Sequence, residues 1–276
     1  MGINFASRNG DVKWVKYATI LWIVAEMTMP VTAATCTPPS RARHSVTNVD
    51  IDGTIRLDNG QRVILKNIIW PNRPLKLGPD ELWNFDNLAR AALVKLLGNK
   101  QIVVYRKSRK PDRYGRFTSR IYLPEKNTDA GEWLLERGLA RWWSGLYDRK
   151  CLEQLVRAEN LARQNELGIW SRKEYRVFHA FDKNISEMHG KFVLVQGKIL
   201  SVGVRRKRTY LNFGHNWSKD FTVVLSKTDH NRFIKAEIDP ESLSGRVVRV
   251  RGWVENYQGS MIRVTHPEQI EYLDNR

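Results

Sequence analysis

The stretch TIRLDNGQRVIL, residues 54–65, decides the fold prediction. Its two runs, Thr54 to Leu57 and Arg62 to Leu65, are rich in the β-branched and aliphatic residues that strands favour. The pair Asn59-Gly60 between them favours the left-handed backbone of a tight hairpin turn. The stretch therefore predicts two antiparallel strands joined by a short turn.

An unusually apolar junction follows this hairpin. Ile68, Ile69 and Trp70 run directly into Pro71 in a chain whose formal net charge is +17. Strand-to-loop junctions are places where enzymes often carry charged functional residues. A junction without charge is therefore unexpected at this point of the chain.

Helices and strands alternate on the C-terminal side of the junction. Apolar residues recur at helical spacing from Leu82 to Leu97, and Gly98 ends the run. The predicted segments after this helix are strands at 102–105 and 117–123, separated by a basic loop at 107–116, and helices at 129–139 and 152–167.

The last ninety or so residues have a different pattern. Five strand-like runs with one helical break predict a small closed barrel. The runs lie at 191–204, 209–214, 220–225, 246–255 and 260–266, and the helical break lies at 230–236.

The first 35 residues form a unit of their own. Lys13 and Lys16 precede an apolar run that Glu26 interrupts, and the small residues Val31 to Ala34 suit signal-peptidase cleavage. The segment predicts an exported protein, periplasmic or secreted, and an uncleaved inner-membrane anchor is the alternative. The predicted layout is a leader at 1–35, a linker at 36–44, a first domain at 45–172, a linker at 173–187 and a second domain at 188–274.

The charge of the chain points to a polyanionic partner. The chain has 276 residues and a pI near 10.0, and its basic residues are spread from Arg41 to Arg263 rather than gathered in one tail. Such a balance suits nucleic acid, anionic lipid or an acidic wall polymer. Solubility alone is the other interpretation of the charge.

Cysteine and histidine give little sign of a metal site. The two cysteines, Cys36 and Cys151, could pair as a disulfide after export, or could be unrelated thiols, and the sequence leaves both open. No histidine pair has the spacing of metal ligands on a helix. We therefore expect no metal and no cofactor.

The motif Asp112-Arg113-Tyr114-Gly115-Arg116, followed by a strand, carries a family resemblance. Together with the hairpin, the run Ala158 to Arg163 and Gly168-Ile169-Trp170, it resembles the staphylococcal nuclease (thermonuclease) family over Ser45 to Trp170. The resemblance implies a mainly β fold with helices (α+β): an OB-like barrel, followed here by a second, smaller OB-like barrel. Active members of that family hydrolyse phosphodiesters in DNA or RNA with calcium.

The resemblance also implies that most catalytic positions have lost their function. The family's two metal-binding aspartates fall on Gly53 and Ile69, its first arginine on Ile64 and its glutamate on Asn72. The second arginine is retained as Arg116. Because isoleucine and glycine side chains offer no lone pair, this set cannot hold a cation, and an inactive nuclease-like domain is expected.

Displaced carboxylates are the alternative that would keep an active, calcium-dependent nuclease. Asp50, Asp52 and Asp58 lie close to the vacated positions. On a strand, however, moving a carboxylate by one residue points it to the other face. Asp52 could therefore serve only if a bulge shifts the register.

Two basic and aromatic loops are the predicted nucleic-acid-binding sites. Cationic side chains suit phosphates, and tyrosine suits a stacked base. The predicted residues are Lys107, Arg109, Lys110, Arg113 and Tyr114 in the first domain and Arg205, Arg206, Lys207, Arg208 and Tyr210 in the second. The structural alternatives are a solvated loop in the first domain and, in the second, a Tyr210 and a Phe213 that alternate into and out of a barrel core. A third hypothesis is a scaffold whose Ile68-Ile69-Trp70 patch docks an envelope protein.

Overall fold

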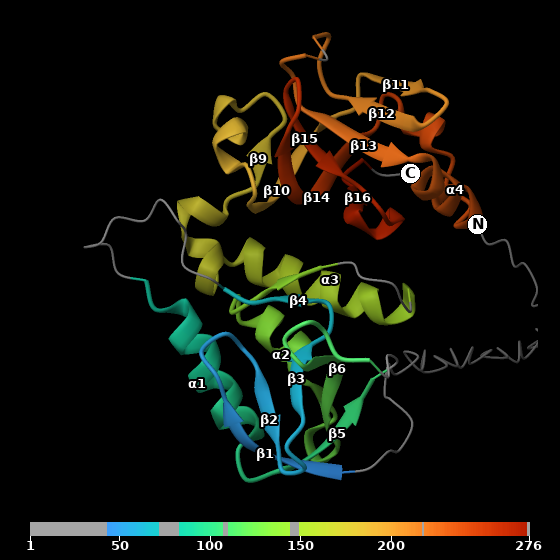
Figure 1. Cartoon of the computed structure of the whole chain (residues 1–276). Helices are drawn as coiled ribbons and strands as arrows, with labels where there is room; N and C mark the ends of the chain where they lie inside the picture. Colours follow the sequence, from blue (N-terminus) through green and yellow to red (C-terminus); the bar gives the residue numbers. More distant parts are fainter. Residues whose placement is uncertain (1–42, 72–82, 107–109, 144–148, 217, 275–276) are drawn as a thin grey trace, which may run out of the picture. The chain divides into compact units, whose positions relative to one another are not determined.

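The computed structural model describes residues 43–71, 83–106, 110–143, 149–216 and 218–274 (Figure 1). By compactness the chain divides into Met1–Thr35 and Cys36–Arg276. The predicted leader lies outside the described residues, as do Cys36, Asn72, Lys107 and Arg109. Within the described part of the chain, no helix is long and apolar enough to cross a membrane.

Five strands close the first barrel (Figure 1). They are β1 (Arg43–Val49), β2 (Ile55–Leu57), β3 (Arg62–Leu65), β5 (Gln101–Tyr105) and β6 (Arg116–Leu123). Their order is β3-β2-β1-β5-β6, and a parallel pairing of β3 with β6 completes the closure. The predicted hairpin is confirmed as β2–β3, in which Ile55 pairs with Val63.

Helices supply the rest of the first core. The predicted helix is confirmed as α1 (Phe85–Leu97), which buries Ala89, Leu93, Leu96 and Leu97. Short strand β7 (Thr128–Asp129) leads into α2 (Ala130–Glu136), and α3 (Arg149–Gln164) follows. Fully buried side chains from strands and helices form one apolar cluster, including Ile55, Val63, Leu93, Ile121 and Leu134.

A second barrel occupies the C-terminal part. Its strands are β10 (Phe192–Lys198), β11 (Ser201–Val204), β12 (Arg208–Asn212), β13 (Thr222–Ser226), β14 (Val247–Asn256) and β15 (Ser260–Arg263). The order is β11-β12-β13-β15-β14-β10-β9, where β9 is Phe178–His179, and β13 and β15 are parallel. Only Ile199 and Leu200 separate β10 from β11 along the chain, although the two strands lie far apart in this order. Helix α4 (Lys227–Lys235) stands between β13 and β14, as the OB-like prediction requires.

The predicted linker at 173–187 differs from the structure. It contains β9 (Phe178–His179), which pairs with β10, and it buries Tyr175, Phe178 and Ile185. Its apolar residues are spaced by short 3-10 turns, so they show neither helical nor strand periodicity. One further strand, β16 (Ile270–Tyr272), pairs with β14 and was also missed. The predicted linker at 36–44 overlaps β1, which begins at Arg43.

A buried ion pair joins the two barrels. Arg251 of β14 and Glu159 of α3 are both fully buried, and their nearest nitrogen and oxygen are 2.9 Å apart. Arg251 also donates to the carbonyl oxygen of Trp142 at 3.1 Å, and its guanidinium carbon lies 3.7 Å from the centroid of that indole ring. The Trp142 backbone N–H donates to Glu159 at 2.9 Å. One residue of the first barrel thus contacts both partners of the pair.

Further charges surround this pair. Glu271 contacts Arg251 and lies 3.1 Å from Arg249 and 3.7 Å from Arg163. Burial raises the pKa of Glu159 although Arg251 opposes the change. Burial also works to raise the pKa of Glu271, but Arg251 and Arg163 outweigh it and lower that pKa. Because unpaired buried charges are expensive, each member depends on the others remaining in place.

We expect Arg251→Ala to reduce the free energy of unfolding by about 3–5 kcal/mol, because it leaves the Glu159 carboxylate buried without its partner. Arg263→Ala is the control, since it breaks an ion pair with Glu255 whose side chains are 36% and 41% exposed. That exposed pair should contribute at most about 1 kcal/mol. Urea denaturation measures both; equal costs would contradict a stabilising network.

Candidate functional site

The Asp112–Arg116 motif forms the turn that starts β6. Asp112 accepts hydrogen bonds from the backbone N–H groups of Tyr114 and Arg116, both at 2.9 Å. Gly115 has φ +73°, a conformation that glycine adopts without strain. The motif therefore has a structural reason to exist, since an aspartate at the first position of a turn satisfies the backbone that follows it.

Arg116 is engaged by two carboxylates. Its Nε and Nη2 each lie 3.0 Å from Asp112 Oδ2, and its Nη1 lies 3.2 Å from Asp52 Oδ2. The Arg116 side chain is 19% exposed. Most of its directed donors are thus occupied by groups of the chain itself. The Asp112 contact was missed, although four-residue spacing between an aspartate and an arginine is a readable signal.

Asp52 comes nearest to the displaced-carboxylate alternative. It lies beside Arg116, and its Oδ1 accepts the backbone N–H of Thr54 at 2.9 Å. Desolvation works to raise the pKa of Asp52, but the hydrogen bonds from Thr54 and the charge of Arg116 outweigh it, so this pKa is lowered. The carboxylate is therefore ionised at neutral pH, but it is already paired with a cation. Across the described ranges, no group of three or more potential metal-ligating side chains converges.

Gly53 has no space for a side chain. Its φ is +80°, and a Cβ atom built there would lie 2.5 Å from Trp70 Cε3. The indole is held in place because Trp70 Nε1 donates to the carbonyl oxygen of Ile51 at 2.8 Å. The position that the resemblance assigns to a metal-binding aspartate is therefore covered by an aromatic ring.

Isoleucines occupy two of the other vacated positions, and one of them takes part in an apolar cluster. Ile64 lies on β3 opposite Thr118 and is half-buried. Ile69 lies on β4 (Ile68–Ile69), which pairs with β8 (Arg141–Trp142), and packs against a cluster that includes Trp170 and Phe192. The apolar junction is thus a packing surface, and the β4–β8 pairing was not foreseen. The remaining position, Asn72, lies outside the described residues.

Tyr114 presents an aromatic face between cations. It is 54% exposed, and the guanidinium carbons of Arg113 and Arg116 lie 4.7 and 5.0 Å from its ring centroid. Arg62 donates to its carbonyl oxygen at 3.1 Å, which ties the loop to β3. Lys110 is exposed on the same loop. Such an arrangement suits a phosphate beside a stacked base.

The second predicted site gathers around a concavity on the second barrel. Arg205, Arg208 and Tyr210 line a pocket of about 340 Å³, together with Tyr257 from another part of the chain. Arg206 and Lys207 are exposed in the turn between β11 and β12. Phe213 is buried in the barrel core whereas Tyr210 is half-buried, which agrees with the structural alternative that the two side chains alternate into and out of the core.

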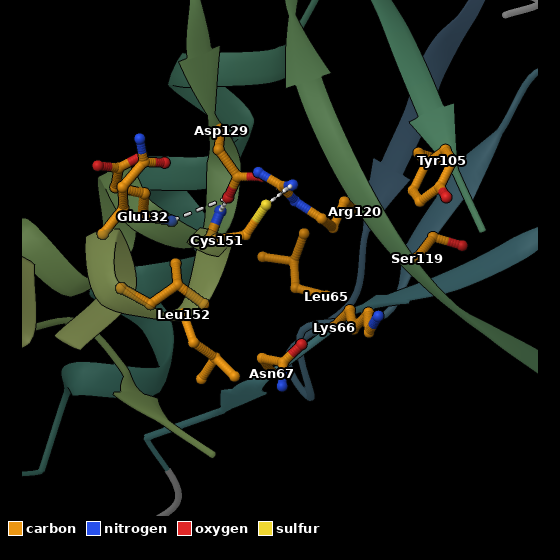
Figure 2. A pocket seen from close by; sticks show the side chains of 13 residues that line it. Leu65, Lys66, Asn67, Tyr105, Ser119, Arg120, Asp129, Glu132, Cys151 and Leu152 are labelled. Atoms are coloured by element: carbon orange, nitrogen blue, oxygen red, sulfur yellow. Dashed lines mark hydrogen bonds and ion pairs between the residues drawn. The ribbon is translucent and has the colours of Figure 1, made fainter. Parts of the chain in front are cut away.

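A second pocket, of about 310 Å³, lies beside α2 and α3 in the first barrel (Figure 2). Arg120 forms a 2.9 Å ion pair with Asp129 and donates to Cys151 Sγ at 3.3 Å. Asp129 also caps α2 by accepting from Gly131 and Glu132. The charges of Arg120 and Asp129 in this pocket therefore offset one another. Cys151 is disulfide-bonded, and its pairing with Cys36 stays a prediction because Cys36 lies outside the described residues.

Comparison with protein families supports the resemblance. Residues 62–172 match the model of the family described as staphylococcal nuclease homologue. The match covers β3 to the end of the first domain and includes Arg116. A search of curated proteins finds no match to the chain. The first barrel is thus a staphylococcal nuclease-like domain.

We expect Gly53→Ala to destabilise the fold by about 1–3 kcal/mol more than Gly60→Ala, because its Cβ would overlap the Trp70 indole. Gly60 is a matched control: its φ is +76° and nothing lies within 4 Å of a Cβ built there. The excess should disappear in a Trp70→Ala background, as a double-mutant cycle by urea denaturation would show. Equal costs at the two glycines would mean that the ring does not fill this position.

Proposed function

We propose that this chain, which contains a staphylococcal nuclease-like domain, binds nucleic acid or another polyanion without hydrolysing it. One observation carries the proposal: the Trp70 indole covers Gly53, where the family pattern places a metal-binding aspartate. Hydrolysis of this type needs oxygen ligands for a hard cation and a group that activates water. The described residues do not fit a calcium ion, so no catalytic step is assigned to them.

Arg116 supports the same conclusion. A catalytic arginine has to direct its donors at the phosphate charge that develops in the transition state. Here Asp112 and Asp52 occupy the guanidinium group. To serve as a metal ligand, Asp52 would have to leave its ion pair with Arg116, and a second charged ligand would be needed beside it. The position of Asp52 beside Arg116 is the observation that favours the active-nuclease alternative, whereas the ion pair between them and the indole over Gly53 oppose it.

Binding of a nucleic acid needs positive charge and aromatic faces but no metal ligands, and the chain has both features. A formal net charge of +17 attracts polyanions over long range. Each barrel provides cations next to an aromatic face. In the first barrel Arg113 lies beside Tyr114, and in the second Arg205 and Arg208 line a pocket with Tyr210. Nucleic acid uses both features, whereas an anionic lipid or a wall polymer would use the charge alone.

Export to the cell envelope is part of the proposal, and it rests on the leader-like pattern of residues 1–35. The scaffold alternative is less well supported. Ile68 and Trp70 are partly buried against the first core, and Ile69 against a neighbouring cluster. A patch whose side chains already pack within the protein offers little area to a partner.

We expect the purified chain to leave DNA and RNA uncut with Ca²⁺, Mg²⁺ or Mn²⁺ and to bind single-stranded DNA with an affinity that falls steeply as salt rises. Arg113→Ala should weaken binding and lower the slope of log K against log salt by about 1, because one phosphate contact is lost. Lys126→Ala, at an exposed lysine after β6, is the matched control. Fluorescence anisotropy across a salt series gives the slopes.

Two results would contradict this function. Calcium-dependent cleavage that Asp52→Ala abolishes would show an active site built from displaced carboxylates. Absence of binding at low salt, to DNA and to RNA, would remove nucleic acid as the ligand. Loss of affinity in Lys126→Ala equal to that in Arg113→Ala would mean that charge alone, and not the Tyr114 loop, governs binding.

A further inference from the structure

The concavity of the second barrel combines features from distant parts of the chain. Its floor comes from β12, β13 and β15, and its rim comes from the turn before β12 and the turn at residues 257–259 between β14 and β15. Two of its lining residues are tyrosines, Tyr210 and Tyr257, and two are arginines, Arg205 and Arg208. None of the lining residues is acidic.

We propose that this groove binds single-stranded nucleic acid in preference to duplex, with an unpaired base stacked on Tyr257 and the adjoining phosphates held by the Arg205–Arg208 turn. The inference rests on the proposed function and names the ligand form and the site. It also adds Tyr257, a residue that the sequence patterns did not single out.

Tyr257 has the properties of a stacking platform. Tyr257 is 65% exposed, the highest value among the exposed large hydrophobic residues that the structure describes. The turn that carries it is tight: the Tyr257 N–H donates to the Gly259 carbonyl oxygen at 3.0 Å, and Gln258 and Gly259 both have positive φ. A Cβ at Gly259 would meet the Asp220 backbone at 3.0 Å, so the turn rests on the neighbouring loop. A ring presented in this way requires little ordering when a base stacks on it.

The cationic turn carries charge that no carboxylate of the described residues neutralises, although Arg205 Nη1 donates to the Val204 carbonyl oxygen at 3.3 Å. Other arginines of this barrel are paired, as Arg246 is with Asp274 and Arg263 with Glu255. The four consecutive cations from Arg205 to Arg208 have no carboxylate partner among the residues that the structure describes. The Arg205 N–H donates to the Arg208 carbonyl oxygen at 2.9 Å, which closes the turn. Free cations on an ordered turn suit a phosphate backbone.

The shape of the site favours a single strand. In a duplex each base is already stacked and paired, so no base face is free to meet a tyrosine. A groove of about 340 Å³ lies at the small end of the range for ligand pockets, which suits one nucleotide of a longer strand. In OB-folds the second and third strands and the adjoining loops bind oligonucleotides or oligosaccharides. Arginines without acidic neighbours favour the oligonucleotide here.

The test is anisotropy of the full chain with a labelled single strand of about 16 nucleotides and with the matching duplex. Tyr257→Ala should weaken single-strand binding about tenfold and leave duplex binding within about twofold, because stacking on a tyrosine is lost. Tyr257→Phe should restore binding, since phenylalanine keeps the ring. Phe181→Ala is the matched control: it removes a ring of the same barrel that is 62% exposed and does not line the groove.

The outcomes separate this inference from the proposed function. If the wild-type chain binds the single strand and Tyr257→Ala binds it with the same affinity, the groove is not the binding site and the proposed function still stands. Equal losses for single strand and duplex in Tyr257→Ala overturn base stacking as the source of the affinity. If the wild-type chain binds neither the single strand nor the duplex, both the groove assignment and the proposed binding of nucleic acid are overturned. Weakening by Phe181→Ala equal to that by Tyr257→Ala also overturns the assignment.

Discussion

The ion pair between Arg251 and Glu159 is the constraint on which the two-barrel structure depends. Both side chains are fully buried, so each needs the other to offset the loss of water. Trp142 lies at the centre: its N–H bonds Glu159, its carbonyl oxygen accepts from Arg251, and its ring stacks on the guanidinium group. A small change in the docking of β14 against α3 would break several of these contacts at once. The two barrels therefore share one buried polar network.

The buried ion pair is connected through neighbouring strands to the positions that the family resemblance assigns to catalysis. Trp142 belongs to β8, whose partner strand β4 carries Ile69 at the position that the family resemblance gives to a metal ligand. Ile69 packs against Trp170 and Phe192, residues that belong to opposite sides of the contact between the barrels. An aspartate at that place would put a carboxylate among aromatic rings at a high desolvation cost. A single Ile69→Asp substitution would therefore place a carboxylate in a packed apolar surface rather than build a cation site.

Local signals in the sequence were sufficient for most of the fold. Asn59-Gly60 fixed the hairpin, the apolar spacing up to Leu97 fixed α1, and short strand runs fixed the second barrel. Contacts between distant residues were beyond such reasoning. Arg251 is 92 positions from Glu159, and nothing in the pattern of β14 marks one of its arginines as buried. Trp70 over Gly53 is a contact of side-chain packing, and a two-residue pairing such as β4–β8 carries too little periodicity to predict.

The buried contact between the barrels also bears on how the proposed polyanion would be held. Tyr114 with Arg113, and Tyr257 with the Arg205 turn, are the two proposed sites, and the barrels that carry them share a buried ion pair. When one site has captured a strand, the second binds at an effective concentration that depends on the length of strand between them. A flexible linker between the barrels would spread the distance between the two sites over many values, whereas a fixed interface would give that distance a single value. The buried arginine that stabilises the fold would thereby also set the length of nucleic acid that the chain binds most tightly.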